Sequence, residues 1–374
     1  YVGDMLGCIH QLLASEFEIL HNLFMGMDGP VSPHSQESDT VREYKAKMER
    51  VLSKTFENIC QPFQARVEQV LESKPGVVVL FRLANLLDFY ARTVTKMIPE
   101  DSKLVSLCIT ECKRKALAEF YQSLSKQSDK VLEDPPSPPA TLSPPALVHN
   151  VLNNLMEIMA VFDSSLVPQE ERQQEFTPVL LAILEPLLKT CTLSATLLPN
   201  ESESDMAVFM VNCLGLIQNS LAGFTFSSAR AEELQGQIDA HMETLVTEEA
   251  RSMLQRCKLG AKLEIFQDWE REPKETRQPL SYVNQMDTRQ LSTAMRSFEE
   301  ALLDISTTAM TQCDKLFSSR LKQIARNNVY QMIIGAYTNL YTAVLEPTNK
   351  YENPALIVPY KPEQLHTMLS SQSS

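Results

Sequence analysis

Apolar residues recur along nearly the whole chain at positions i, i+3, i+4 and i+7, the spacing that places them on one face of an α-helix. Two-residue alternation, the pattern of a half-buried strand, is almost absent. The β-like run Val77-Val78-Val79 continues into a longer pattern that favours a buried helix. The chain has 10 glycines in 374 residues, which disfavours doubly wound nucleotide-binding folds and β-sandwiches, because both use glycine at phosphate loops and tight turns. The sequence therefore predicts an all-α protein, either a helical bundle or an array of stacked helices.

Prolines separate most of the predicted helices. The first helix ends near Met25, and the second runs from a cap at Asp39 to the break at Pro75. Pro62 and Pro186 lie inside apolar-periodic stretches, and we expect a kink or a helix break at each. A buried helix follows Pro75, and further helices are predicted at about residues 100–132, 145–162, 169–190, 205–222, 228–258, 287–319, 321–346 and 362–370.

The clearest boundary is the segment DPPSPPATLSPP, residues 134–145, which cannot be helical or pair in a sheet and should be extended. We interpret it as a semi-rigid linker or loop; the alternatives are a PxxP ligand or a phosphorylation site at Ser137 or Ser143. A weaker break lies between Trp269 and Pro279. We therefore predict three helical bundles, at residues 1–133, 146–270 and 271–374. Because the chain begins at Tyr1 inside a periodic pattern, we also expect it to be part of a longer protein.

Residues 205–226 read DMAVFMVNCLGLIQNSLAGFTF, and no side chain from Met206 through Ala229 is charged. A run of this length is long enough to span a bilayer. On a helical wheel, however, Asn212, Gly215 and Asn219 share one side and the large apolar residues take the other. The flanks carry carboxylates and serines, without the Lys/Arg clusters or the Trp/Tyr belts of membrane helices. We interpret the stretch as a central bundle helix whose small face lets another helix approach closely.

Two E-x-x-H motifs place a carboxylate and an imidazole on one helix face, at Glu18 with His21 and at Glu363 with His366. Di-iron bundles use two such motifs together with two further glutamates on four long helices. The second motif lies just after Pro362, where little helix remains. We therefore interpret both motifs as solvated helix faces and predict no metal and no cofactor.

Other reactive residues have equally simple explanations. Cys108 and Cys112 share a helix face but have no second pair at zinc-site spacing, and the eight scattered cysteines suit buried free thiols. The acidic pairs at 170–171, 248–249 and 299–300 adjoin helix starts or polar faces, and the basic run Lys113-Arg114-Lys115 suits a solvated face. No nucleotide-binding or nucleophile-elbow motif occurs, so we predict no catalytic residues. The net charge of −13 argues against nucleic acid and against general attraction to anionic lipid.

Short stretches along the chain carry a further signal. Among them are Tyr1-Val2-Gly3-Asp4-Met5-Leu6, Asn85-Leu86-Leu87-Asp88-Phe89-Tyr90 and Phe209-Met210-Val211-Asn212. In order with the stretches at 66–70, 164–168, 186–191, 240–245 and 341–351, they resemble the sixth subunits of the conserved oligomeric Golgi complex. The resemblance covers essentially the whole chain and departs most at residues 26–40 and 134–145.

The resemblance implies a non-enzymatic scaffold, an elongated rod of stacked helical bundles such as vesicle-tethering complexes contain. It implies a peripheral location on the cytosolic face of the Golgi membrane and a role in intra-Golgi retrograde transport, which supports glycosylation. The implied partners are sister subunits, SNAREs and small Rab GTPases. No contact residue can be transferred, so the partner-binding residues are unassigned. The alternative is a helical adaptor or scaffold unrelated to tethering.

Overall fold

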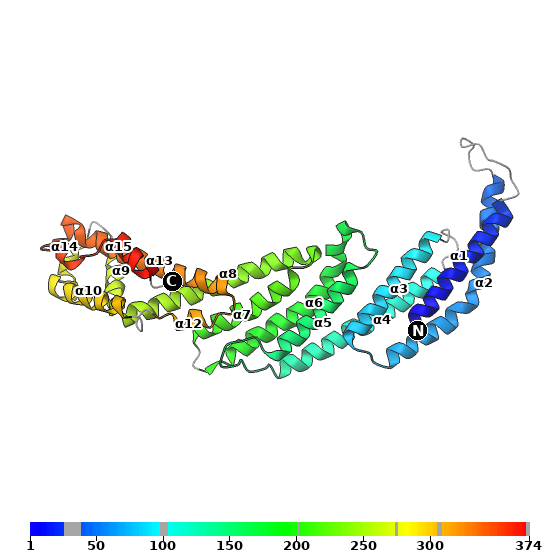
Figure 1. The fold of residues 1–374 in the computed structure, drawn as a ribbon, viewed down its shortest axis with the longest axis horizontal. Helices are drawn as coiled ribbons and strands as arrows, with labels where there is room; N and C mark the ends of the chain where they lie inside the picture. Colours follow the sequence, from blue (N-terminus) through cyan, green and yellow to red (C-terminus); the bar gives the residue numbers. More distant parts are fainter. Residues whose placement is uncertain (26–38, 98–103, 200–201, 274–275, 305–308, 372–374) are drawn as a thin grey trace. The chain divides into compact units, whose positions relative to one another are not determined.

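The fold was analysed in a computed structural model that describes residues 1–25, 39–97, 104–199, 202–273, 276–304 and 309–371. The described residues form α-helices and short 3-10 turns and contain no strand, which confirms the predicted all-α class (Figure 1). The longer helices are α1 (Val2–Met25), α2 (Asp39–Glu72), α3 (Val77–Met97), α4 (Leu104–Glu133), α5 (Ala146–Asp163), α6 (Gln169–Thr196), α7 (Glu203–Leu221), α8 (Ser228–Arg256), α9 (Gly260–Arg271), α10 (Thr288–Leu303), α13 (Ser319–Leu345) and α15 (Pro362–Ser371). The short elements are η2 (Thr225–Ser227), η3 (Leu280–Tyr282), α12 (Thr311–Asp314), η4 (Pro347–Asn349) and α14 (Pro354–Ile357).

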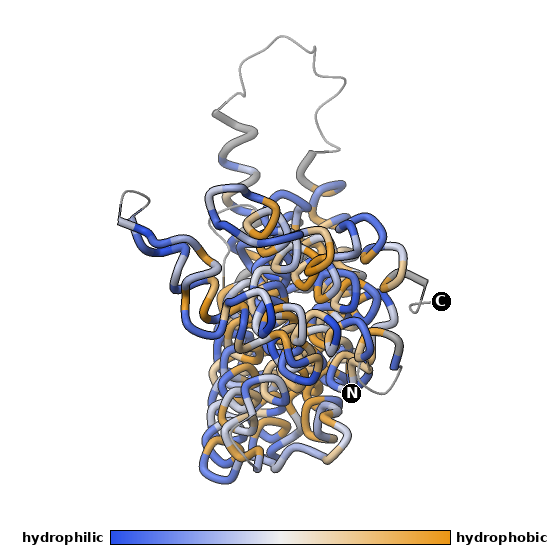
Figure 2. Tube along the Cα trace, turned by 90° about the vertical axis from the view of Figure 1, so that its left-hand side faces the viewer, coloured by the Kyte–Doolittle hydropathy of each residue, from blue (hydrophilic) through white to orange (hydrophobic). Residues whose placement is uncertain are grey.

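The chain divides into two compact units. Unit 1 comprises Tyr1–Asp134, His149–Lys189 and Leu221–Ser228, and unit 2 comprises Pro135–Val148, Thr190–Ser220 and Ala229–Ser374. Orange and blue stretches alternate along the coiled tube in Figure 2, as expected for helices with one apolar and one polar side. The division into three bundles at 1–133, 146–270 and 271–374 stays a prediction.

Helices α1 to α4 of unit 1 pack around one apolar core. The face of α1 that the periodicity predicts is buried at Leu6, Ile9 and Leu13, which are at most 6% exposed. The other helices contribute residues at the same helical spacing, since each must bury one apolar stripe. They include Leu52, Phe56, Phe63 and Val67 of α2, Leu83, Leu87 and Val94 of α3, and Val105, Ile109 and Ala116 of α4.

The Pro-rich segment is neither helical nor part of a sheet, as predicted, yet its second half is packed. Leu142, Pro144 and Pro145 are buried, and Leu142 adopts a left-handed backbone conformation with φ 57°. A bulky side chain rarely adopts this conformation without tertiary contacts that hold it. The segment therefore includes a fixed loop of unit 2 as well as exposed residues such as Ser137.

Two sequence predictions of helix extent are wrong. The helix predicted at 287–319 ends at Leu303, where Asp304 takes an extended conformation. Beyond it, backbone groups of Ala309 and Gln312 bind side chains of α8 instead of continuing a helical ladder. The second error concerns α9, a short helix that was not predicted from the sequence. Helices α2 and α6 continue through Pro62 and Pro186, so neither proline breaks its helix.

Candidate interaction sites

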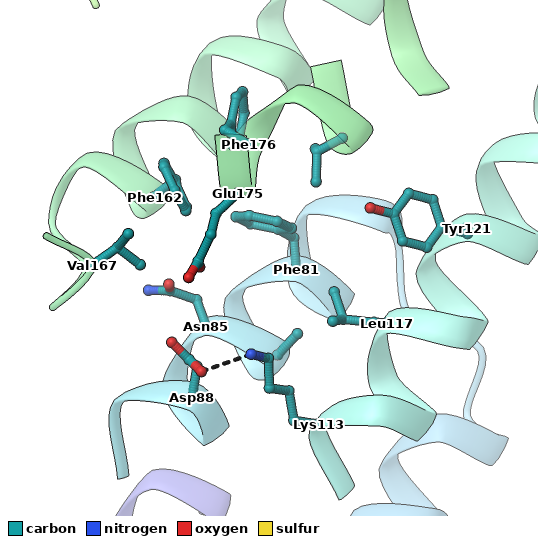
Figure 3. Close-up of a pocket in the computed structure, with 12 residues that line it drawn as sticks. Phe81, Asn85, Asp88, Lys113, Leu117, Tyr121, Phe162, Val167, Glu175 and Phe176 are labelled. Atoms are coloured by element: carbon teal, nitrogen blue, oxygen red, sulfur yellow. Dashed lines mark hydrogen bonds and ion pairs between the residues drawn. The ribbon is translucent and has the colours of Figure 1, made fainter. Parts of the chain in front are cut away.

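A cavity of about 140 Å³ lies in unit 1 between α3, α4, α5 and α6 (Figure 3). Aromatic rings form one wall, and the polar groups of Asn85, Asp88 and Lys113 lie at its base (Figure 3). The lining is completed by Phe81, Ala84, Leu117, Tyr121, Phe162, Val167, Glu175, Phe176 and Val179.

The charged groups at this cavity are paired with one another. One carboxylate oxygen of Asp88 accepts a hydrogen bond from Lys113 Nζ at 2.7 Å, and the other accepts from Arg92 Nε at 2.8 Å. Arg92 also donates to Glu175 Oε1 at 3.0 Å. These ion pairs join α3 to α4 and α6, and Asp88 is only 14% exposed in its side chain. Since each charge is already neutralised, the site is better suited to holding helices together than to binding a charged ligand.

The segment 85–90 of α3 is a junction of unit 1. Asn85 donates to the carbonyl of Val161 in α5 at 3.3 Å, and Leu87 is fully buried. The Tyr90 ring meets His10 of α1 edge to face at 6.1 Å. Together with the ion pairs of Asp88, these contacts link α3 to α1, α4 and α5. In the sequence this segment stands out only by its resemblance to a known family. Its contacts could not be predicted, because the residues that it contacts are distant along the chain.

In the basic run, two of the three cations bind other helices. Lys113 binds Asp88 of α3, and Lys115 binds Glu68 of α2 at 2.6 Å. Arg114 pairs with Glu111 on its own helix. The interpretation as a merely solvated face is therefore wrong for Lys113, whose partner Asp88 is largely buried, whereas Arg114 and Lys115 form their ion pairs on the solvated surface.

The uncharged stretch forms helix α7 as far as Leu221, and most large apolar residues of that helix are buried. Phe209, Cys213, Leu214 and Ile217 have no exposed surface, which supports the interpretation as a bundle helix. A close helix approach at its small face is not found, since a methyl group added at Gly215 would meet no atom within 4 Å.

Two irregular segments cover this face of α7 at Asn212. The Asn212 amide nitrogen donates to the carbonyls of Leu142 at 3.0 Å and Lys315 at 3.1 Å. Its oxygen accepts from the amide of Phe317 at 2.9 Å. An ion pair between Asp205 and Lys315, at 2.8 Å, holds the same segment. Asn212, 6% exposed, therefore fixes both the Pro-rich loop and the turn after α12.

Another helix, α6, is the one described helix that is long and apolar enough to cross a membrane. Of its most apolar window, 44% is buried inside the protein. Length and composition alone are weak evidence, since a core helix passes the same test.

The two residues of the acidic pair at 248–249 differ in environment. Glu249 is 2% exposed, accepts from Arg256 at 3.4 Å and from the amide of Gln312 at 3.3 Å, and so holds the start of α12. The placement on a polar face is wrong for this residue, because the segment after α10 folds back over α8. Its partner Glu248 pairs with Arg251 one turn along α8.

The two E-x-x-H motifs lie in different units. Glu18 and His21 are exposed on α1 in unit 1, and Glu363 and His366 are exposed on α15 in unit 2. Within the described residues, no group of three or more His, Cys, Asp or Glu side chains is placed to hold a metal ion.

The eight cysteines are free, and only Cys8 is exposed. Burial raises the pKa of Cys60 to about 12, of Cys257 to about 11 and of Cys313 to about 12. A hydrogen bond with Cys112 and burial raise the pKa of Cys108, and a hydrogen bond with Cys191 and burial raise that of Cys213. Because the thiolate is the reactive form, these thiols are inert at neutral pH.

Since Cys60 is half-buried and the remaining six cysteines besides Cys8 are buried, we expect a disulfide reagent at pH 8 to label Cys8 rapidly in the folded chain and the other cysteines only after unfolding. Time-resolved release of the chromophore gives the number of reactive thiols. Cys8→Ser should remove the fast phase and leave the slow phases unchanged. Fast labelling of several thiols in the folded chain would contradict the described burial.

The sequence is similar to known proteins over nearly its whole length. Residues 1–369 match the family described as "Conserved Oligomeric Golgi complex subunit 6, C-terminal". The chain is 34% identical over 390 residues to conserved oligomeric Golgi complex subunit 6 of Dictyostelium discoideum, covering 99% of the chain and 57% of that protein. It is 33% identical over 370 residues to the subunit of Homo sapiens, covering 99% of the chain and 53% of that protein. The chain thus spans about half the length of these relatives.

The fold is similar to that of an exocyst component from S. cerevisiae, Exo70p. A crystal structure of that protein matches with a TM-score of 0.60 at 12% identity, over 100% of this chain and 70% of that chain. A second Exo70p structure matches with a TM-score of 0.58 at 13% identity and the same coverage. At this identity the likeness concerns the fold alone.

Proposed function

The chain belongs to the family of the carboxy-terminal region of conserved oligomeric Golgi complex subunit 6, and from this premise we propose that it is the helical scaffold of a Golgi vesicle-tethering subunit. The match over residues 1–369 carries the proposal. An exocyst-like fold supports it. The relatives at 33–34% identity over 99% of the chain support it as well.

The contacts within each unit suit a scaffold that works by rigidity. The Lys113–Asp88 and Arg92–Glu175 ion pairs in unit 1 and the Asn212 hydrogen bonds in unit 2 fix helices and loops that are far apart in sequence. Buried polar groups with all partners present rigidify a fold and specify one arrangement. A rigid helical body holds binding surfaces at fixed separation, which is the mechanism that we propose in place of catalysis.

The finer proposal concerns partners and place. The chain would assemble with sister subunits and bind SNAREs and small Rab GTPases during intra-Golgi retrograde transport. It would lie at the cytosolic face of the Golgi membrane as a peripheral protein. Partners would lay helices along exposed grooves of the helical units, a common mode of helix recognition.

Pull-down with the purified folded chain tests this proposal. We expect it to retain purified sister subunits, and in separate reactions SNAREs and Rab GTPases, above the level retained by an unrelated helical protein of similar charge. Recovery of none of them by a chain with intact helical circular dichroism would favour the alternative, a helical adaptor unrelated to tethering.

A further inference from the structure

Helix α1 has a second apolar stripe that the bundle does not cover. Leu12, Ile19 and Leu23 are 51%, 50% and 59% exposed, whereas the core face of the same helix is nearly fully buried. Cys8 is exposed on the same side. An exposed row of large apolar groups on one helix marks an interaction surface more often than scattered single residues do.

The spacing of this row is that of a helix-packing seam. The α1 stripe, defined here as Cys8, Leu12, Ser15, Ile19 and Leu23, advances by four, three, four and four residues. Steps of three and four keep the residues on one side of a helix and let knobs of a second helix pack between them. At about 1.5 Å per residue the stripe is roughly 22 Å long, which is about four turns of a partner helix.

The charge of α1 indicates what kind of helix would fit. Its sequence contains Asp4, Glu16 and Glu18 and no Lys or Arg. No ion pair joins Glu16 or Glu18 to any side chain that the structure describes. Opposite charges flanking an apolar seam set the choice of partner in helix pairs, and like charges oppose pairing. A second copy of α1 would place carboxylates against carboxylates, and anionic lipid would meet the same repulsion.

We propose that the α1 stripe is the docking site for a partner helix whose apolar seam is flanked by Lys or Arg. This inference rests on the proposed function, in which the chain assembles with other helical subunits. The central residues Leu12 and Ile19 would supply most of the binding energy, because a few central apolar anchors dominate interfaces of this kind. Glu16 and Glu18 would set the charge preference and make binding sensitive to salt.

The test uses the full chain and two designed peptides of about four heptads with Leu at a and d. One peptide has Lys at e and g, the other Glu. Fluorescence anisotropy is expected to show binding of the Lys peptide that weakens with salt, and at least about tenfold weaker binding of the Glu peptide. The double substitution Leu12→Lys with Ile19→Lys should weaken binding of the Lys peptide by at least about tenfold.

The matched control is Leu107→Lys on α4, which removes a side chain that is 60% exposed and lies outside the stripe. It should leave the affinity unchanged, and both variants should keep wild-type helicity because the substituted residues are exposed. Equal affinity of the double variant and the wild type, or a preference for the Glu peptide, would overturn the proposal. So would stripe-dependent dimerisation of the chain, or stripe-dependent binding to vesicles of phosphatidylcholine and phosphatidylserine.

The pull-down separates this inference from the proposed function. If wild type and double variant retain sister subunits equally, the α1 stripe is not the docking site, and the tethering assignment stands. If the wild type retains none, the tethering assignment fails regardless of the peptide result.

Discussion

Replacing Asn212 with leucine is expected to lower the free energy of unfolding of unit 2 by about 3–5 kcal/mol. Leucine has a similar branched shape but no polar atom, so the carbonyls of Leu142 and Lys315 and the amide of Phe317 lose their side-chain partner. Each buried backbone group left without a partner costs about 1–3 kcal/mol. For units of this size a loss of 1 kcal/mol lowers Tm by about 2–4 °C, so thermal circular dichroism should show a decrease of roughly 10 °C.

Asn219→Leu is the matched control on the same helix. Asn219 is exposed, and its substitution should change the unfolding free energy by less than about 0.5 kcal/mol. Hydrogen exchange localises the effect, because the Phe317 amide should exchange faster in Asn212→Leu than in the control. Equal stability of the two variants would show that the amide group of Asn212 does not hold the Pro-rich loop.

Helix α7 shows which structural features can be predicted from local sequence and which cannot. The helical wheel separates Asn212 from the large apolar residues, which are buried as that pattern predicts. The partners of Asn212 could not be predicted, because Leu142 and Lys315 lie 70 and 103 residues away. A periodic pattern determines which face of a helix is buried, and it carries no information on which distant segment covers that face.

The helix predicted at 287–319 ends at Leu303 for a similar reason, because distant segments contact the residues beyond it. Apolar residues continue at helical spacing beyond Leu303, and buried Cys313 and Leu316 satisfy the pattern. Side chains from α7 and α8 bind the backbone of this segment and replace helical hydrogen bonds. Tertiary contacts of this kind override local helix preference, which is weak for each residue.

The exposed stripe of α1 shows a second feature that sequence periodicity does not predict. In α1, periodicity correctly identifies Leu6, Ile9 and Leu13 as core. It does not reveal that Leu12 and Ile19 stay exposed, since an apolar residue beside a core stripe is equally compatible with a second packing neighbour. Only the arrangement of α2 and α3 around α1 shows which of its apolar sides has no neighbour in the described structure.

Phe176→Ala is expected to lower the free energy of unfolding of unit 1 by about 3–5 kcal/mol. The Phe176 ring is 1% exposed and lies 4.8 Å from the ring of Phe162 and 5.0 Å from that of Phe226, measured between centroids. Removing a buried phenyl group loses its transfer free energy and leaves a cavity, which together cost about 3–5 kcal/mol. The new space would join the cavity that Phe176 already lines, so collapse of the surrounding helices would be incomplete.

Urea unfolding followed by circular dichroism, with hydrogen exchange to assign the affected unit, measures this loss. Phe176→Leu fills most of the space and should cost less than half as much as the alanine variant, because the residual cavity determines much of the penalty. Phe89→Ala is the matched control, since Phe89 lies on α3 with 39% of its surface exposed and leaves no internal cavity. A loss for Phe176→Ala no larger than that for Phe89→Ala would show that the Phe176 ring contributes little to the stability of unit 1. The Arg92–Glu175 ion pair would then be the stronger link between α3 and α6.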